Sequence, residues 1–112
     1  MKKFIVVMSV FILPFLPVEV VAENCTGSTG EMFRCAQRMF EKADAKLNQV
    51  WQQLPQGTRD NLRQAQLNWI NYKEQKCRNE ADMGRNGTTQ PLIELGCLTG
   101  ETEKRTAELE KF

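Results

Sequence analysis

Apolar residues recur every three or four positions along the first half of the chain, the spacing of a helix that buries one stripe. They fall at positions 32, 35, 36, 39, 40, 43, 47, 50, 51 and 54. Ahead of them, Ser28 and Glu31 have the spacing of a capping box, in which the serine caps the helix and the glutamate reaches back. Pro55 disfavours helical geometry at the residue before it. These signals predict a helix from about residue 29 to residue 54.

A second apolar stripe follows a short turn that contains Gly57, and Thr58 is placed to cap the helix that carries it. The stripe comprises Leu62, Ala65, Trp69 and Tyr72, with Cys77 continuing it. We expect this helix to fade near residues 81–83. Because the turn is short, the two helices are expected to lie side by side and antiparallel.

The rest of the chain predicts a long loop and a shorter third helix. Residues 82–90 have no apolar periodicity, and Pro91 suits the first position of a short helical turn that Gly96 ends. A helix from about residue 99 to residue 111 follows, with Thr102 and Arg105 on its inward face. The predicted fold is one all-α domain, a disulfide-stapled antiparallel helical hairpin with the shorter helix packed across its open end.

Residues 1–22 have the anatomy of a secretory signal peptide: two lysines, an apolar run, and small residues at the end. Pro14 and Pro17 interrupt the run, which is also too short to predict stable membrane insertion. Cys25 is not directly preceded by a small residue, so a lipoprotein signal is not predicted. We therefore expect residues 23–112 to form a single exported domain, periplasmic or secreted from a bacterial envelope.

Charge argues against nucleic acid as a partner. The whole chain carries a formal net charge of +1, and loss of Lys2, Lys3 and Glu19 with the leader brings it to zero. Binding to nucleic acid usually calls for a clear basic excess.

Four cysteines, an even number in a short exported domain, predict two disulfides. The chain has no histidine and no close cysteine pair, so neither a metal site nor another cofactor is expected. We favour the local pairing, Cys25 with Cys35 and Cys77 with Cys97. The rival pairing joins Cys35 to Cys77 and Cys25 to Cys97, because the hairpin brings Cys35 and Cys77 to matching heights.

Polar residues on the expected core faces predict a structural network rather than a ligand site. Asp44 is expected to pair with Arg105, and Asn48 with Gln66, because a buried charge without a partner is costly. Three aromatic residues are expected to fill the core: Trp51, Trp69 and Tyr72. Without histidine, and with its cysteines oxidised, the chain offers little acid-base machinery, so no catalytic residue and no enzyme activity are predicted.

With these elements placed, the sequence resembles the LprI-type family, small exported domains named for a bacterial lysozyme inhibitor. The matching residues are Cys25, Cys35, Ala43, Asp44, Leu47, Asn48, Trp51, Leu62, Arg63, Gln66, Trp69, Tyr72, Cys77, Gly87, Thr88, Pro91, Cys97, Leu98, Thr102, Arg105, Thr106 and Leu109. The family's usual Arg-Asp before the third cysteine is here Lys73-Glu74. The resemblance implies a non-catalytic protein that binds a protein partner and occludes the cleft of a lysozyme. The alternative is a structural or regulatory envelope protein that binds or neutralises another protein.

The loop before Pro91 is the sequence's candidate for partner binding, since exposed loops on rigid scaffolds commonly carry binding residues. A lysozyme cleft holds two carboxylates, to which Arg85, Asn86 and Thr88 offer hydrogen-bond donors. The other interpretation is an ordinary solvated connection held by Cys77 and Cys97.

Overall fold

All regular structure in the part of the chain described by the computed structural model, residues 25–84 and 89–112, is helical. Helix α2 spans Thr29–Gln53, α3 spans Gln56–Gly84 and α4 spans Gln90–Leu109. The predicted all-α class with a shorter third helix is confirmed. The predicted leader, residues 1–22, lies outside the described residues. Among the described helices, none is both long and apolar enough to cross a membrane.

Both ends of α2 are set by the residues that predicted them. Ser28 Oγ accepts a hydrogen bond from the Glu31 amide at 3.1 Å, and Glu31 Oε1 accepts one from the Ser28 amide at 2.9 Å, which completes the capping box. At the other end Leu54 is extended, with ψ of 145°, ahead of Pro55.

Helix α3 begins at Gln56, three residues before the start that a Thr58 cap would give, so Thr58 is not its cap. The Pro55 carbonyl already accepts a hydrogen bond from the Arg59 amide at 3.0 Å. Proline fixes its own φ near the helical value, so a helix can begin directly after it.

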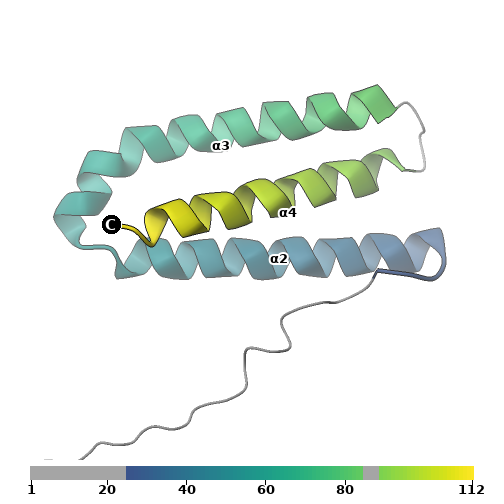
Figure 1. Cartoon of the computed structure of the whole chain (residues 1–112), viewed down its shortest axis with the longest axis horizontal. Helices are drawn as coiled ribbons and strands as arrows, with labels where there is room; N and C mark the ends of the chain where they lie inside the picture. The colour runs from purple at the N-terminus through teal and green to yellow at the C-terminus, as the bar shows by residue number, and fades with distance from the viewer. Residues whose placement is uncertain (1–24, 85–88) are drawn as a thin grey trace, which may run out of the picture.

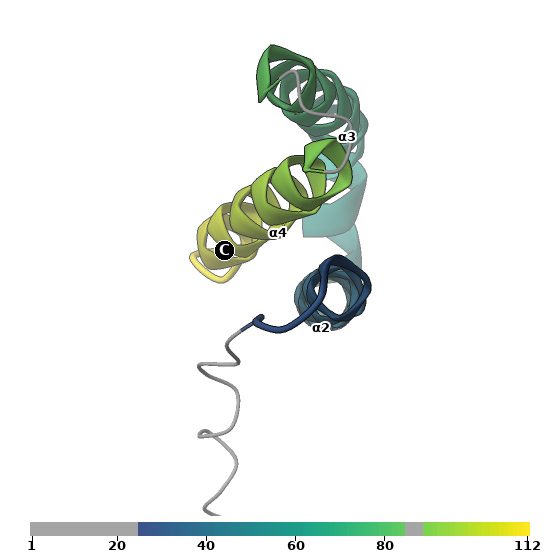
Figure 2. The ribbon, with the colours of Figure 1, turned by 90° about the vertical axis from the view of Figure 1, so that its right-hand side faces the viewer.

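Helix α4 lies along the space between α2 and α3 and packs against both (Figure 1). It runs parallel to α2 and antiparallel to α3, and the end view in Figure 2 shows it between them. The two long helices contact each other only marginally. We expected the third helix to cross the open end of a closed hairpin, and this placement differs because α4 offers two burying faces rather than one stripe.

Most of the buried residues of α4 are threonines, whose short side chains suit a helix that has neighbours on two sides. The buried residues are Thr99, Glu101, Thr102, Thr106 and Leu109. Thr102 and Leu109 are fully enclosed, and Leu109 joins α2 residues in the core cluster Leu47, Val50, Leu54 and Leu109. Thr106 satisfies its hydroxyl by donating to the Thr102 carbonyl at 2.9 Å. Short side chains therefore let both long helices approach the central one.

Helix α4 is continuous through Gly96, where the sequence predicted a break. Gly96 is exposed, and a Cβ built on it would meet no atom within 4 Å. Glycine in a helix costs about 1 kcal/mol relative to alanine. The half-buried Leu95, Cys97 and Leu98 on either side contribute packing that outweighs this cost.

The buried stripe of α3 is turned by one residue from the predicted one. Its centre consists of Gln66, Lys73, Cys77 and Ala81, all less than 9% exposed. Tyr72, predicted to be a core aromatic, is 55% exposed, and Ala65 is also exposed. The prediction followed the apolar residues, whereas a glutamine and a lysine hold two of the positions that face the rest of the protein.

Polar contacts tie α4 to α3 along this stripe. Arg105 Nε donates to Gln66 Oε1 of α3 at 2.9 Å. Within α4, Arg105 Nη1 also contacts Glu108 Oε1 at 3.0 Å. Lys76 Nζ lies 2.6 Å from a Glu80 carboxylate oxygen and 3.3 Å from one of Glu101. The hydrogen bond with Glu80, and to a lesser extent the one with Glu101, raises the pKa of Lys76 above its usual value.

The favoured disulfide pairing is confirmed. Cys25 is bonded to Cys35, and Cys77 to Cys97. The first bridge ties the lead-in to the first turns of α2. The second ties α3 to α4 across residues 85–88, so it fixes the end of the fold opposite the α2–α3 turn.

Replacing Gly96 with alanine should raise the free energy of unfolding by about 0.5–1 kcal/mol, because alanine removes backbone entropy from the unfolded chain and meets nothing in the helix. Urea unfolding followed by circular dichroism measures the change. The contrasting variant is Gly27→Ala: Gly27 has φ of 103°, and a Cβ there would collide with the Glu31 carboxylate of the capping box. That variant should be less stable, and a loss of stability in Gly96→Ala would contradict the account of α4.

Replacing Gln66 with leucine should lower the free energy of unfolding by about 1–3 kcal/mol, because it leaves Nε of the half-buried Arg105 without its acceptor. Gln64→Leu is the matched control on the same helix, since exposed Gln64 bonds only to exposed Asn68. That change should stay within about 0.5 kcal/mol. Equal effects in chemical denaturation would show that the Gln66 contact does not stabilise the fold.

Candidate functional site

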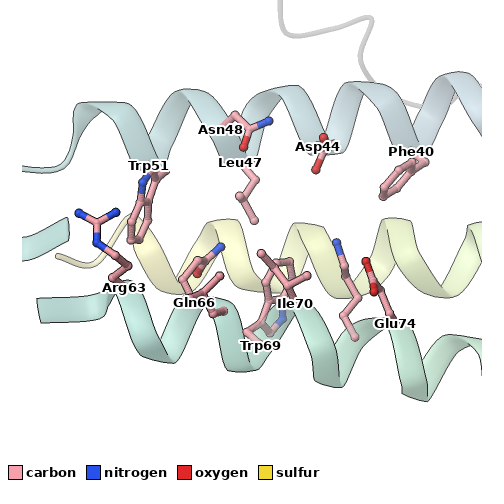
Figure 3. Close-up of a pocket in the computed structure, with 12 residues that line it drawn as sticks. Phe40, Asp44, Leu47, Asn48, Trp51, Arg63, Gln66, Trp69, Ile70 and Glu74 are labelled. Carbon is pink, nitrogen blue, oxygen red and sulfur yellow. The ribbon is translucent and has the colours of Figure 1, made fainter. Parts of the chain in front are cut away.

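An open groove of about 480 Å³ runs between α2 and α3 (Figure 3). It exists because α4 holds the two long helices apart. The lining residues come from both walls: Phe40, Asp44, Leu47, Asn48 and Trp51 of α2, and Arg63, Gln66, Leu67, Trp69, Ile70, Lys73 and Glu74 of α3. A groove of this size with aromatic walls and a few polar groups is typical of a binding site.

Helical spacing places these residues on one face of each wall. On α2, Phe40, Asp44, Leu47 and Trp51 follow each other at intervals of four, three and four, and Asn48 lies next to Leu47, so these side chains share one face of the helix. In Figure 3 the side chains of Leu47 and Ile70 lie between the two long helices, with Trp51 nearer the α2–α3 turn and Phe40 nearer the other end. Apolar side chains therefore occur along the whole groove, among polar and charged ones.

Lys73 is the most unusual residue of the groove. Only 7% of it is exposed, and its ammonium lies 4.5 Å from the centre of the Trp69 ring and 5.7 Å from that of Phe40. A second cation is near Trp69, since the Arg105 guanidinium lies 5.9 Å from the centre of the same ring. Aromatic rings attract cations through their electron-rich faces. Within the described residues, Lys73 has no carboxylate partner.

The predicted polar network is arranged differently in the structure. Arg105 bonds to Gln66 and Glu108 and not to Asp44, because α4 turns the arginine towards α3. Asp44 is half-buried and Asn48 is exposed, and both line the groove. Asp44 and Asn48 therefore face the space between the long helices, where the sequence placed a closed interface.

Of the three predicted core aromatics, two reach the core and one does not. Trp51 and Trp69 are partly buried and pack against the core cluster. Tyr72 is exposed and does not line the groove. The loop residues Arg85, Asn86 and Thr88 lie outside the described residues, so their predicted role stays a prediction.

The sequence did contain a signal for Lys73. It lies seven residues after Gln66 and four before Cys77, which is the spacing of one helix face. A lysine between a buried cystine and a buried glutamine indicates a cation drawn towards the interior. From the sequence, we interpret Lys73 only as part of the Lys73-Glu74 pair, which stands where the family usually has Arg-Asp before the third cysteine.

The chemistry of the groove is that of recognition. In the described part of the chain, no three histidine, cysteine, aspartate or glutamate residues group to hold a metal ion. The groove instead combines aromatic rings, aliphatic side chains and charges of both signs, which can bind a chemically mixed surface.

Comparison with known proteins shows the family. The model of the family described as "Lysozyme inhibitor LprI" matches residues 22–109, well over half of the chain. An uncharacterized protein of Rhizobium meliloti (strain 1021) is 30% identical over 95 residues, covering 70% of this chain and 68% of that protein. No solved structure gives a significant match.

A shorter similarity involves the E3 ubiquitin-protein ligase BRE1-like 2 of Oryza sativa, subspecies indica and japonica. Each is 44% identical over 52 residues, which cover 46% of this chain but only 6% of the ligase. So small a share of the ligase carries no functional argument. The match to the LprI family supports a non-catalytic, protein-binding role, and the chain belongs to the LprI lysozyme inhibitor family.

Proposed function

We propose that this protein is an exported, non-catalytic inhibitor that binds a lysozyme and occludes its active-site cleft. The observation that carries the proposal is the match of the LprI lysozyme inhibitor family over residues 22–109. A bacterial envelope is the proposed location, in the periplasm or outside the cell. The signal-like residues 1–22 support export, because this segment has the charge and apolar pattern of a secretory leader.

The stabilisation of the fold agrees with that location. All four cysteines are in disulfides, and disulfides persist in oxidising compartments such as the periplasm. A three-helix domain with a small core gains from such bridges, each of which contributes about 2–4 kcal/mol. The fold is therefore suited to work outside the cytoplasm.

The side chains support binding rather than catalysis. The chain has no histidine, and the cysteines are bonded and cannot act as nucleophiles. Among the carboxylates, Glu101 is held by Lys76 and Lys104, at 3.3 and 3.6 Å. Glu101 is thus engaged in ion pairs within the fold.

The purified exported protein, mixed with chicken-type lysozyme, should slow the lysis of bacterial cell walls in proportion to its concentration. Turbidity measures the lysis, and size-exclusion chromatography of the mixture should show a complex. The control is the same protein with both disulfides reduced and alkylated, which should lose its effect as the fold loosens.

Unchanged lysis at large molar excess, across several types of lysozyme, would reject inhibition. Capture of a different envelope protein by the folded chain, with lysis unaffected, would favour the alternative role of a structural or regulatory binding protein.

A further inference from the structure

Two opposite charges face the groove from opposite walls without meeting each other. Lys73 comes from α3 and Asp44 from α2. Within the described residues, neither side chain forms an ion pair or a hydrogen bond, and the only recorded contacts of the Lys73 ammonium are with aromatic rings. The groove thus presents a positive and a negative group, each without a counter-charge.

This arrangement withdraws most of the Lys73 side chain from water and leaves its ammonium, at the open groove, without an anionic partner among the described residues. Taking a charge out of water is unfavourable unless a partner compensates for it, and ring faces compensate only in part. An apolar side chain of similar length in place of Lys73 would fill the same space without that penalty. The position of Lys73 therefore favours binding of a group that supplies the missing negative charge.

The apolar side chains of the groove indicate a further feature of the same occupant. Leu47 and Ile70 lie beside the two charged positions, on the side nearer the α2–α3 turn, and the half-exposed Leu67 lines the groove as well. An apolar side chain inserted there would be removed from water on both sides. The fitting occupant therefore has an apolar residue next to its charged ones.

The other two charged residues of the groove do not alter the expected chemistry of the occupant. Arg63 already contacts Asp60 at 2.8 Å, and both side chains are more than half exposed. Glu74 is exposed as well. Water screens these groups, so they contribute less to recognition than the buried Lys73.

We infer that the groove between α2 and α3 is the docking surface for the lysozyme, which inserts a segment with an acidic side chain against Lys73, a basic side chain against Asp44 and an apolar residue next to them, on the side of the α2–α3 turn. This inference rests on the proposed function and adds the surface and its chemistry. A mixed-charge protein segment fits better than a sugar, because the Lys73 and Arg105 cations already occupy the neighbourhood of the Trp69 ring on which a sugar would stack.

The first arm of the test compares variants in the lysis assay and by calorimetric titration with lysozyme. Lys73→Met and Asp44→Asn should each weaken binding at least about tenfold, because the partner's charge is left buried without its counterpart. Lys46→Met is the matched control, since Lys46 lies outside the groove with a 57% exposed side chain and should bind as the wild type does. Thermal unfolding should show Lys73→Met to be at least as stable as the wild type.

A second arm does not need lysozyme. The capped peptide acetyl-Glu-Leu-Lys-amide is titrated into ¹⁵N-labelled protein, and the indole N–H signals of Trp51 and Trp69 report on the groove. The peptide should shift both signals in the wild type and in Lys46→Met but not in Lys73→Met. A trisaccharide of N-acetylglucosamine, titrated in the same way, should leave them unchanged.

The two arms separate the inference from the function on which it rests. If lysozyme is inhibited and Lys73→Met, folded, inhibits equally well, the docking surface is wrong and the proposed function stands. If no lysozyme is inhibited, the proposed function fails, and the peptide titration decides whether the groove has the inferred chemistry. Shifts produced by the trisaccharide and not by the peptide would overturn the inference in favour of a glycan site.

Discussion

The packing of α4 against both long helices is the constraint on which the rest of the structure depends. Three threonines and Leu109 form one buried stripe of this helix, and Glu101 and Arg105 contact α3 from another face, so α4 separates α2 from α3 where a closed hairpin would have joined them. Arg105 and Lys76 then fasten α3 to it through Gln66 and Glu101. The groove is a direct consequence, because helices held apart by a third cannot fill the space between their remaining faces.

Sequence alone predicted the features that depend on local chemistry. The start of α2 follows from Ser28 and Glu31, its end from Pro55, and the disulfide pairing from the closeness of each cysteine pair along the chain. These interactions connect residues at most 20 positions apart. They are little affected by how the helices are arranged in space.

The arrangement of the helices was harder to predict because polar residues hold key buried positions. Gln66 and Lys73 lie on the inward face of α3, so a stripe drawn through apolar residues alone points towards Tyr72 and turns the helix the wrong way. The predicted end of a helical turn at Gly96 was also wrong, since a glycine on an exposed helix face does not have to end the helix. The groove was therefore not predicted, although most of its residues had been singled out.

Lys73 connects this difficulty to function. A sequence optimised for stability alone would place an apolar residue at a position 7% exposed between Phe40 and Trp69, and the helix pattern would then be easy to interpret. Places where local rules conflict with the fold are commonly functional, because a binding surface has to keep groups that the free protein only partly satisfies. The residue that most obscured the packing of α3 is thus also the one that most clearly marks the groove as a surface for a partner.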